Sequence, residues 1–183
     1  SQETALVKSL PASGSITPEA KAPDQVLVLT ASYTDQGEGN ARPLTGIRSV
    51  ALPSNTLLFS PGLEKEGVSD INFGGRDILV LGENEGWFAL KGVDLNGVSS
   101  VSLLAGWQAP PAVGFDFELR LGAPGGELAG KGSINTPLSG EGTMVSIPLQ
   151  KSHSGKKDLY LHYKKQPGSS EAVIIGLMSA TFN

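Results

Sequence analysis

The stretch that decides the fold class runs Val113-Gly114-Phe115-Asp116-Phe117-Glu118-Leu119-Arg120-Leu121. From position 115 onward, phenylalanines and leucines alternate with charged residues. This period of two puts the apolar side chains on one face of an extended chain, as a half-buried antiparallel strand requires. The stretch therefore predicts a β-strand that covers an apolar core with one side only.

Similar strands are expected on both sides of this stretch. They are short, apolar or alternating, and bounded by turn residues, and the dipeptide Asn96-Gly97 is typical of a hairpin turn. About nine to eleven strands at this spacing are typical of sandwiches and barrels. Besides 113–121, the predicted strands lie at 26–33, 47–52, 57–59, 78–81, 87–93, 101–105, 145–149, 159–163 and 172–182.

The composition agrees with a folded, turn-rich domain. Of 183 residues, 39% are hydrophobic and 17% are charged, while 24 glycines and 12 prolines favour many turns over long helices. A formal net charge of −4 offers no basic face for nucleic acid. Because cysteine is absent, disulfides, thiolate zinc sites, iron–sulfur clusters and c-type haem attachment are excluded.

The chain is expected to divide into three parts. Residues 1–24 are predicted to be an extended arm or linker, because prolines and small polar residues dominate them. Residues 25–54 are predicted to be a strand pair or linker that packs on or precedes the main domain, which spans 55–183. No apolar run reaches the ~20 residues of a membrane span, and Ser1 to Thr4 lack signal-peptide features. We therefore expect a mature chain or a piece of a longer one.

Three segments resemble a family 6 carbohydrate-binding module. Residues 117–130 are similar to that family's "hydrophobic-E-hydrophobic-R-L-D-S-P-x-G-x-L-I-G" hairpin. Residues 155–164 are similar to its "G-x-H-D-L-Y-L-x-F-K" strand, and residues 86–95 to its "G-D-W-x-x-Y-x-N-V-D" segment. The resemblance implies an all-β fold, a jelly-roll β-sandwich over 55–183, with the N-terminal extended arm and one or two extra strands before it.

The same resemblance implies that the family's usual ligand site is degenerate here. The family clamps a sugar between two loop aromatics, places an asparagine before its last strand, and often binds calcium through an early acidic pair. The corresponding positions in this chain are Leu81 and Gly142 or Thr143 for the aromatics, Gly176 for the asparagine, and Phe59 and Pro61 for the acidic pair.

The candidate ligand-binding residues are Trp107, Trp87, Glu83, Asn84 and Glu85. Sugars stack their apolar C–H faces on exposed aromatic rings, and Trp107 follows a strand and enters a loop. Trp87 begins a strand, and the resemblance makes it a core residue instead. The acidic loop could contribute to a calcium site, but calcium takes six to eight oxygen ligands, so a solvated turn is expected and no cofactor is predicted.

No catalytic set can be assembled from the sequence, so we expect no enzyme activity. His153 and His162 are the only histidines, whereas a catalytic zinc usually has three protein ligands. His162 lies on the polar side of its predicted strand, where a solvent-facing histidine needs no catalytic role. Residues 125–131 spell a phosphate-loop pattern, but the following Ser/Thr is replaced by Gly132 and no helix follows.

Two functions are therefore expected to compete. The first is a non-catalytic glycan-binding module, and the second is a structural or partner-binding module that lost the sugar site. A buried Trp107 ring would favour the second. The expected partners are a glycan or neighbouring protein domains, with no nucleic acid and no membrane span. Residues 28–46 are also similar to a segment preceding such modules in large exported bacterial proteins. This likeness implies the C-terminal part of such a protein, secreted, periplasmic or on the cell surface.

Overall fold

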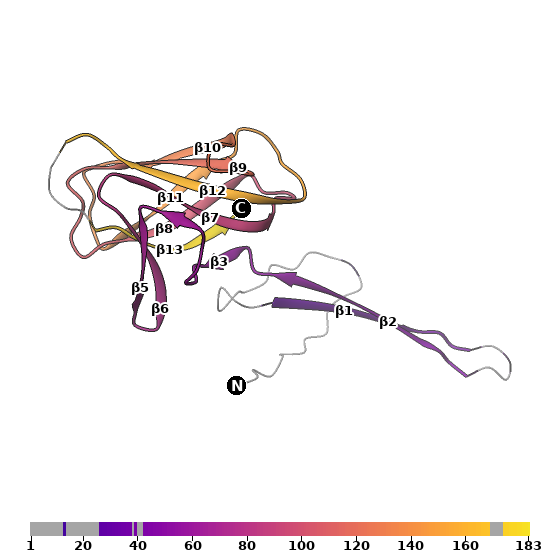
Figure 1. Ribbon diagram of the computed structural model, residues 1–183. Helices are drawn as coiled ribbons and strands as arrows, with labels where there is room; N and C mark the ends of the chain where they lie inside the picture. The colour runs from indigo at the N-terminus through magenta and orange to yellow at the C-terminus, as the bar shows by residue number, and fades with distance from the viewer. Residues whose placement is uncertain (1–12, 14–25, 38, 40–41, 169–173) are drawn as a thin grey trace.

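The computed structural model describes residues 13, 26–37, 39, 42–168 and 174–183 (Figure 1). Within this part of the chain the regular structure consists entirely of β-strands. The strands are β1 (Val26–Thr34), β2 (Thr45–Pro53), β3 (Thr56–Leu58), β4 (Lys65–Glu66), β5 (Val68–Phe73), β6 (Arg76–Leu81), β7 (Glu85–Asp94), β8 (Ser100–Gly106), β9 (Phe115–Leu121), β10 (Glu127–Ile134), β11 (Gly142–Pro148), β12 (Lys156–Lys165) and β13 (Gly176–Phe182).

Two sheets face each other and form a β-sandwich, which confirms the predicted fold class. The upper sheet has the strand order β10-β9-β12-β7-β4, and the lower sheet has the order β11-β8-β13-β6-β5, with β3 also paired to β13 (Figure 1). Every pairing of neighbouring strands is antiparallel. Most strands that follow one another in the chain lie in different sheets, so the chain crosses repeatedly between the two layers.

The core lies between the sheets and is filled by alternate residues of each strand. Phe115, Phe117 and Leu119 of β9 are at most 1% exposed, so the alternation at 115–121 correctly predicted the buried face. Leu159 and Leu161 of β12 point the same way and are fully buried. Because β12 lies between β9 and β7, these two leucines occupy the centre of the upper sheet's inner face.

The turn at Asn96-Gly97 is present, but the hairpin predicted there is wrong. It connects β7 of the upper sheet to β8 of the lower sheet, and these strands do not pair. Side-chain hydrogen bonds hold the turn instead: Asp94 Oδ1 accepts from the Asn96 backbone N–H at 3.0 Å, and Asn96 Oδ1 accepts from the Gly155 N–H at 3.1 Å. The turn therefore ties the crossover to the segment before β12.

The number and limits of the strands differ from the prediction at the edges. The last strand begins at Gly176 rather than at 172, with residues 172–173 lying outside the described part. The structure adds β4, β5 and β10 to the predicted strands, and of these β10 was implied only by the resemblance of 117–130 to a hairpin. β5 carries only partly buried or exposed side chains at a sheet edge. An edge strand that buries little surface lacks the apolar pattern on which the prediction depends.

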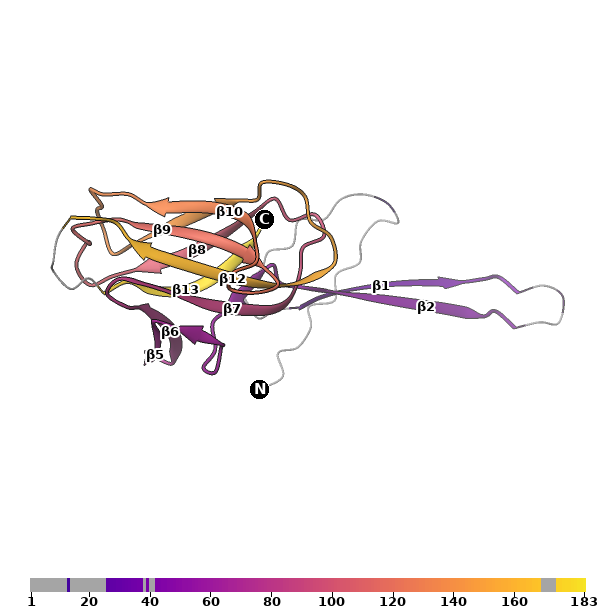
Figure 2. The ribbon, with the colours of Figure 1, turned by 45° about the horizontal axis from the view of Figure 1, so that its top comes forward.

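The strand pair expected in 25–54 is the hairpin β1–β2, whose strands pair along nine residues each. It projects away from the sandwich in both views (Figures 1 and 2). Asp35 closes its distal end, because its Oδ1 accepts hydrogen bonds from the backbone N–H groups of Gly37 at 3.0 Å and Leu44 at 2.9 Å. The arm predicted at 1–24 lies outside the described residues, apart from Ser13.

Candidate functional site

A groove of about 830 Å³ crosses the outer surface of the upper sheet. It receives residues from each of the strands of that sheet, β4, β7, β9, β10 and β12. The groove therefore follows from the sheet itself rather than from the loops at its end. Its lining residues are Glu66, Gly67, Glu85, Gly86, Trp87, Asp116, Phe117, Glu118, Lys131, Gly132, Ser133, His162, Tyr163 and Lys164.

A row of five outward-facing side chains runs straight across this groove, and we call it the groove row. Its members are direct cross-strand partners in neighbouring strands. They point outward because the residues before and after each of them in β7, β9 and β12 point into the core. In order across the sheet, the groove row is Glu66, Trp87, His162, Glu118 and Lys131.

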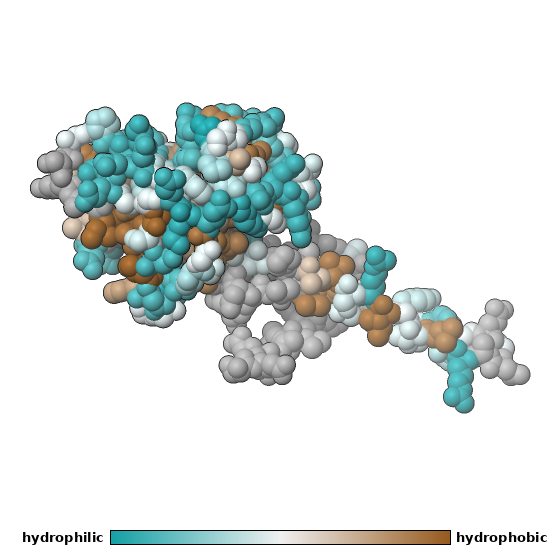
Figure 3. All heavy atoms as spheres, in the orientation of Figure 1, coloured by the Kyte–Doolittle hydropathy of each residue, from teal (hydrophilic) through white to brown (hydrophobic). Residues whose placement is uncertain are grey.

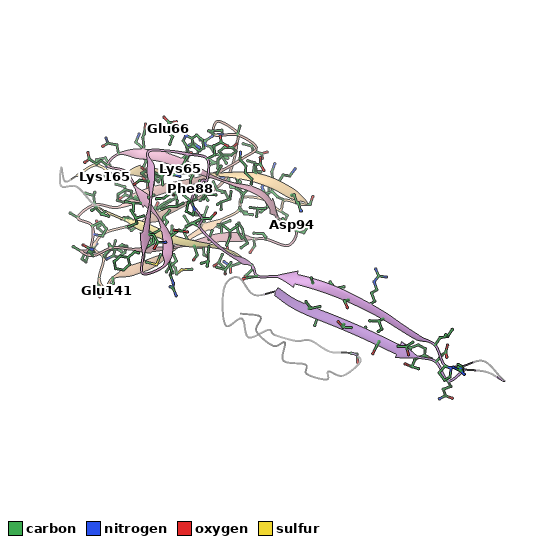
Figure 4. The ribbon with its side chains drawn as sticks, turned by 60° about the horizontal axis from the view of Figure 1, so that its bottom comes forward. Lys65, Glu66, Phe88, Asp94, Glu141 and Lys165 are labelled. Carbon is green, nitrogen blue, oxygen red and sulfur yellow. The ribbon has the colours of Figure 1, made fainter. Side chains whose placement is uncertain are left out.

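Trp87 is the partly exposed aromatic residue of the groove row. Its Nε1–H donates a hydrogen bond to Glu66 Oε2 at 3.1 Å, which fixes the orientation of the indole. The ring of Tyr160 packs beside it with centroids 5.5 Å apart, and the imidazole of His162 lies 6.4 Å away. Figure 4 shows Glu66 at the periphery of the sandwich, whereas Phe88, the next residue after Trp87, lies inside it.

The charged groups on the far side of His162 from Trp87 are paired with one another. Glu118 binds Lys131 through Oε1 at 2.7 Å and Arg120 through Oε2 at 2.6 Å. The hydrogen bond from Lys131 and then that from Arg120 lower the pKa of Glu118, so it stays ionised near neutral pH. An ionised carboxylate is a hydrogen-bond acceptor only, which suits a hydroxyl-bearing ligand.

His162 occupies the middle of the groove row. Burial lowers its pKa, although the Pro124 carbonyl and the charge of Glu118 act in the opposite direction. The imidazole is therefore neutral near neutral pH. Its Nε2 is buried and has no hydrogen-bond partner among the described residues. Because this atom is shielded from solvent, it is not presented to a ligand in the groove.

The structure separates the two tryptophans in a way that reverses the sequence-based expectation. Trp107 is only 7% exposed, and its Nε1–H donates to the Gly140 carbonyl at 2.8 Å inside the core cluster. Its ring is therefore not presented to a ligand. Trp87, which the resemblance placed in the core, lies instead on the outer face of β7.

Of the predicted acidic loop, only Glu85 reaches the groove. Its carboxylate lies 3.6 Å from Lys164 Nζ, on the cross-strand partner residue of β12. Glu83 and Asn84 are exposed and do not line the groove, and the Asn84 carbonyl accepts a hydrogen bond from the Lys165 N–H at 2.7 Å. No cluster of three or more potential metal-ligating side chains occurs in the described part of the chain.

Sequence reasoning missed most of the groove row. Glu118 and Lys131 are not among the predicted candidate residues, and for His162 a place on the polar side of its strand is a sufficient explanation. The alternation in β9 and β12 does place Glu118 and His162 on the outer face. The cross-strand registers that align them with Trp87, however, connect residues far apart in the chain, and the sequence does not reveal those registers.

The positions that the resemblance assigned to the usual sugar and calcium sites carry structural residues. Leu81 and Phe59 are each 3% exposed, and the Phe59 ring packs edge-on against Phe88 with centroids 5.4 Å apart. Gly142 begins β11 and Gly176 begins β13. These positions therefore contribute to the core and the strands rather than to a set of loop ligands.

Solved carbohydrate-binding modules share this fold. A family 6 module from Clostridium stercorarium in complex with cellobiose superposes with a TM-score of 0.53 at 17% identity, covering 70% of this chain and 92% of that one. A family 6 module from Clostridium cellulolyticum in complex with xylose gives 0.52 at 21% identity, covering 65% and 88%. The C-terminal family 6 module of a marine laminarinase from Zobellia galactanivorans gives 0.50 at 15%, covering 70% and 99%.

The chain therefore has the β-sandwich fold of a family 6 carbohydrate-binding module, as the sequence segments predicted. The sequence itself matches no protein-family model and no curated protein. At these identities the likeness establishes the fold, whereas the ligand has to be argued from the groove. In the described part of the chain, no helix is long and apolar enough to cross a membrane.

Proposed function

We propose that this protein is a non-catalytic carbohydrate-binding module that holds a glycan in the groove of the upper sheet. The observation that carries the proposal is the indole of Trp87, which is oriented by Glu66 and lies among hydrogen-bonding groups. A sugar has an apolar C–H face that packs on an aromatic ring and hydroxyl groups that need donors and acceptors at its rim. The groove row offers both kinds of contact.

The proposed binding surface lies away from the loops that the sequence suggested. The burial of Trp107 and Leu81 leaves little aromatic surface at the loop positions. The groove instead offers the carboxylates of Glu66 and Glu118 and the ammonium group of Lys131 along one line. No metal is required for these contacts, so binding is expected to be independent of calcium.

The test is a fluorescence titration of the intact chain with soluble polysaccharides, with and without calcium. We expect a saturable change with one class of glycan and a loss of affinity of about tenfold or more in Trp87→Ala, because aromatic anchors dominate such interfaces. Circular dichroism should show that the variant remains folded. A glycan that binds wild type and Trp87→Ala equally well would contradict the proposal.

Trp107→Phe is the matched control for this experiment. The substitution removes the hydrogen bond to the Gly140 carbonyl and leaves that acceptor without its partner. We expect a loss of about 1–3 kcal/mol in the free energy of unfolding and an unchanged glycan affinity. Urea denaturation and the same titration measure the two effects separately.

A structural or partner-binding module is the second candidate. The buried Trp107 and the core residues at Leu81 and Phe59 favour it, because the aromatic and acidic groups of the usual sites are missing there. This function takes precedence if a folded wild-type chain binds no glycan class. The expectation that the module works outside the cytoplasm, within a larger exported bacterial protein, belongs to the same proposal and is supported by the resemblance of residues 28–46.

A further inference from the structure

Exposed apolar side chains gather on the outer face of the lower sheet among small polar residues such as Ser102 and Thr181, and we call this surface the outer apolar face. Its side chains come from β3, β5, β6, β8, β11 and β13, and several are more than a third exposed: Phe73 68%, Met144 54%, Leu58 47%, Ile71 45% and Leu104 36%. Monomeric soluble proteins rarely leave a continuous apolar patch of this kind without a binding role. Figure 3 shows brown, hydrophobic residues gathered near β5, β6 and β8.

The strand registers make this face continuous. Met144 pairs with Leu104, and Leu104 and Leu58 both pair with Ser179 of β13 between them. Toward the β5 edge of the same sheet, Ile71 of β5 pairs with Ile78 of β6.

Two glycines, Gly106 and Gly176, leave room on this surface for neighbouring apolar side chains. The side chain of Met178 lies over Gly106, and the side chain of Ile78 lies over Gly176, where a β-carbon would leave too little room. The partly buried Met178 and Ile78 therefore fill the space between the exposed residues of the outer apolar face.

A second unpartnered apolar surface lies on one side of the hairpin β1–β2. Leu29 pairs with Val50, and Ala31 and Tyr33 follow on the same side, with Arg48 as the charged residue opposite Ala31. Tyr33 is 74% exposed and Val50 is 50% exposed. The opposite side is mixed: it carries Val28, 57% exposed, and Ile47, 69% exposed. Its hydroxyl groups pair across the strands, Thr30 with Ser49 at 2.9 Å and Thr34 with Thr45 at 2.7 Å.

An isolated two-stranded hairpin is only marginally stable in water, so this one requires a surface on which to lie. Its own sandwich does not supply that surface. Asn55 at the base of the hairpin is fixed to β13, because its carbonyl accepts from the Phe182 N–H at 2.8 Å and its Nδ2 donates to the Phe182 carbonyl at 3.1 Å. From this anchor the hairpin points away from the sandwich (Figures 1 and 2).

We infer that the hairpin of one copy lies on the outer apolar face of a second copy, and that two copies exchange their hairpins reciprocally. Nine residues at about 3.4 Å each give the hairpin a length of about 30 Å. The lower sheet is about 20 Å across at about 4.8 Å between strands. The hairpin is therefore long enough to cross the whole face, bringing Tyr33 and Val50 against residues such as Phe73 and Met144.

Reciprocal exchange is what makes the buried area sufficient. One hairpin side of about 30 by 10 Å covers about 300 Å² of sheet and hides as much of its own surface. Two such contacts in one dimer bury about 1,200 Å² in total, which is at the lower end of the range for stable interfaces. A single contact would fall below that range, so the twofold arrangement is favoured.

Sedimentation velocity of the full chain, from micromolar to millimolar concentration, tests this inference. We expect a concentration-dependent dimer. The hairpin variant Tyr33→Thr/Val50→Thr and the sheet variant Ile71→Thr/Phe73→Thr should each raise the dimer dissociation constant by about tenfold or more. Both keep residues of good strand propensity at exposed positions. The control variant Val28→Thr/Ile47→Thr removes as many exposed apolar residues from the opposite side of the hairpin and should leave the constant within about twofold.

Mixing the two variants identifies the contact. In an equimolar mixture, the intact hairpin of the sheet variant meets the intact sheet of the hairpin variant, so one of the two contacts is restored. We expect the mixture to associate more tightly than either variant alone. A wild-type chain that stays monomeric, a control that weakens the dimer equally, or a mixture no tighter than its components would each overturn the inference.

This inference is independent of the proposed function. The groove lies on the upper sheet, and none of the substituted residues lines it. Glycan affinity should therefore be the same in the monomeric variants and in the wild-type chain.

Discussion

Trp87 and Trp107 show how little separates a core residue from a surface residue in this fold. Both lie at the end of a strand, Trp87 near the start of β7 and Trp107 directly after β8. Trp107 finds a backbone acceptor, Gly140, which allows its polar Nε1–H to be buried. Trp87 faces outward and takes a side-chain acceptor, Glu66, at the groove. The partner of the indole N–H distinguishes the two environments.

His162 should give the free energy of unfolding a specific pH dependence. Because burial lowers its pKa in the folded state, the unfolded state binds the proton more readily. Stability is therefore fully present above the ordinary histidine pKa of about 6.5 and falls as pH decreases below it. Urea denaturation between pH 7.5 and 5 should show this decline in wild type and a smaller one in His162→Gln. Equal declines in both proteins would exclude this role.

The denaturation measurements should end at pH 5, because a second group begins to affect stability below that pH. The pKa of Glu118 is also lowered in the folded state, by Lys131 and Arg120. Its contribution is present above the ordinary glutamate pKa and disappears as pH falls through the folded value. Measurements above pH 5 therefore report on the histidine with little contribution from the carboxylate.

Among the elements, β12 is the one that joins the two layers at the end near the groove. Tyr163 of β12 is 2% exposed, and its hydroxyl donates to the Gly67 carbonyl and accepts from the Gly82 N–H at 2.7 Å. Gly67 connects β4 to β5, and Gly82 lies between β6 and β7, so each marks a crossing from one sheet to the other. A β-carbon on Gly86 would lie 2.8 Å from the Tyr163 ring, which explains the glycine there.

Removing this hydroxyl should loosen both crossings. We expect Tyr163→Phe to lower the free energy of unfolding by about 1 kcal/mol, because the Gly67 carbonyl and the Gly82 N–H each lose a hydrogen-bond partner and keep only their bond to each other at 2.9 Å. Tyr160→Phe is the matched control on the same strand. Its hydroxyl is bonded to the solvent-exposed Lys91, so its loss should cost less. Urea denaturation at pH 7 measures both, and a larger loss in Tyr160→Phe would contradict this assignment.

At the scale of the whole molecule, stability is distributed unevenly between the sandwich and the hairpin. The sandwich has a core of fully buried side chains between two sheets. The hairpin has no second layer among the described residues, and its side chains from 30 to 34 and from 45 to 51 are exposed. Local opening of the hairpin is therefore expected to need much less free energy than opening of the sandwich.

Amide hydrogen exchange measures this difference directly. In dilute, monomeric protein, the paired amides of β1 and β2 should exchange orders of magnitude faster than those of β12, which lies between two strands in the centre of the upper sheet. If hairpins are exchanged between copies, the protection of β1 and β2 should rise with protein concentration while that of β12 stays constant. Equal protection of the hairpin and β12 in dilute protein would show that another surface covers the hairpin.

The sequence by itself determined the β-sandwich, the inner face of β9 and β12, and the strand pair before the sandwich. These features follow from local patterns, because the period of two and the turn residues act within a few positions of the chain. Trp87 and Glu85 were also among the predicted ligand residues, although Trp87 was expected in the core.

Only the tertiary structure decided which tryptophan reaches the surface and which side chains stand beside it. The groove row brings together Glu66, Trp87, Glu118, Lys131 and His162 through the register of strands distant in the sequence. The outer apolar face arises in the same way, from strands as far apart as β3 and β13. Register depends on the summed packing of whole strands, and no local pattern contains that information.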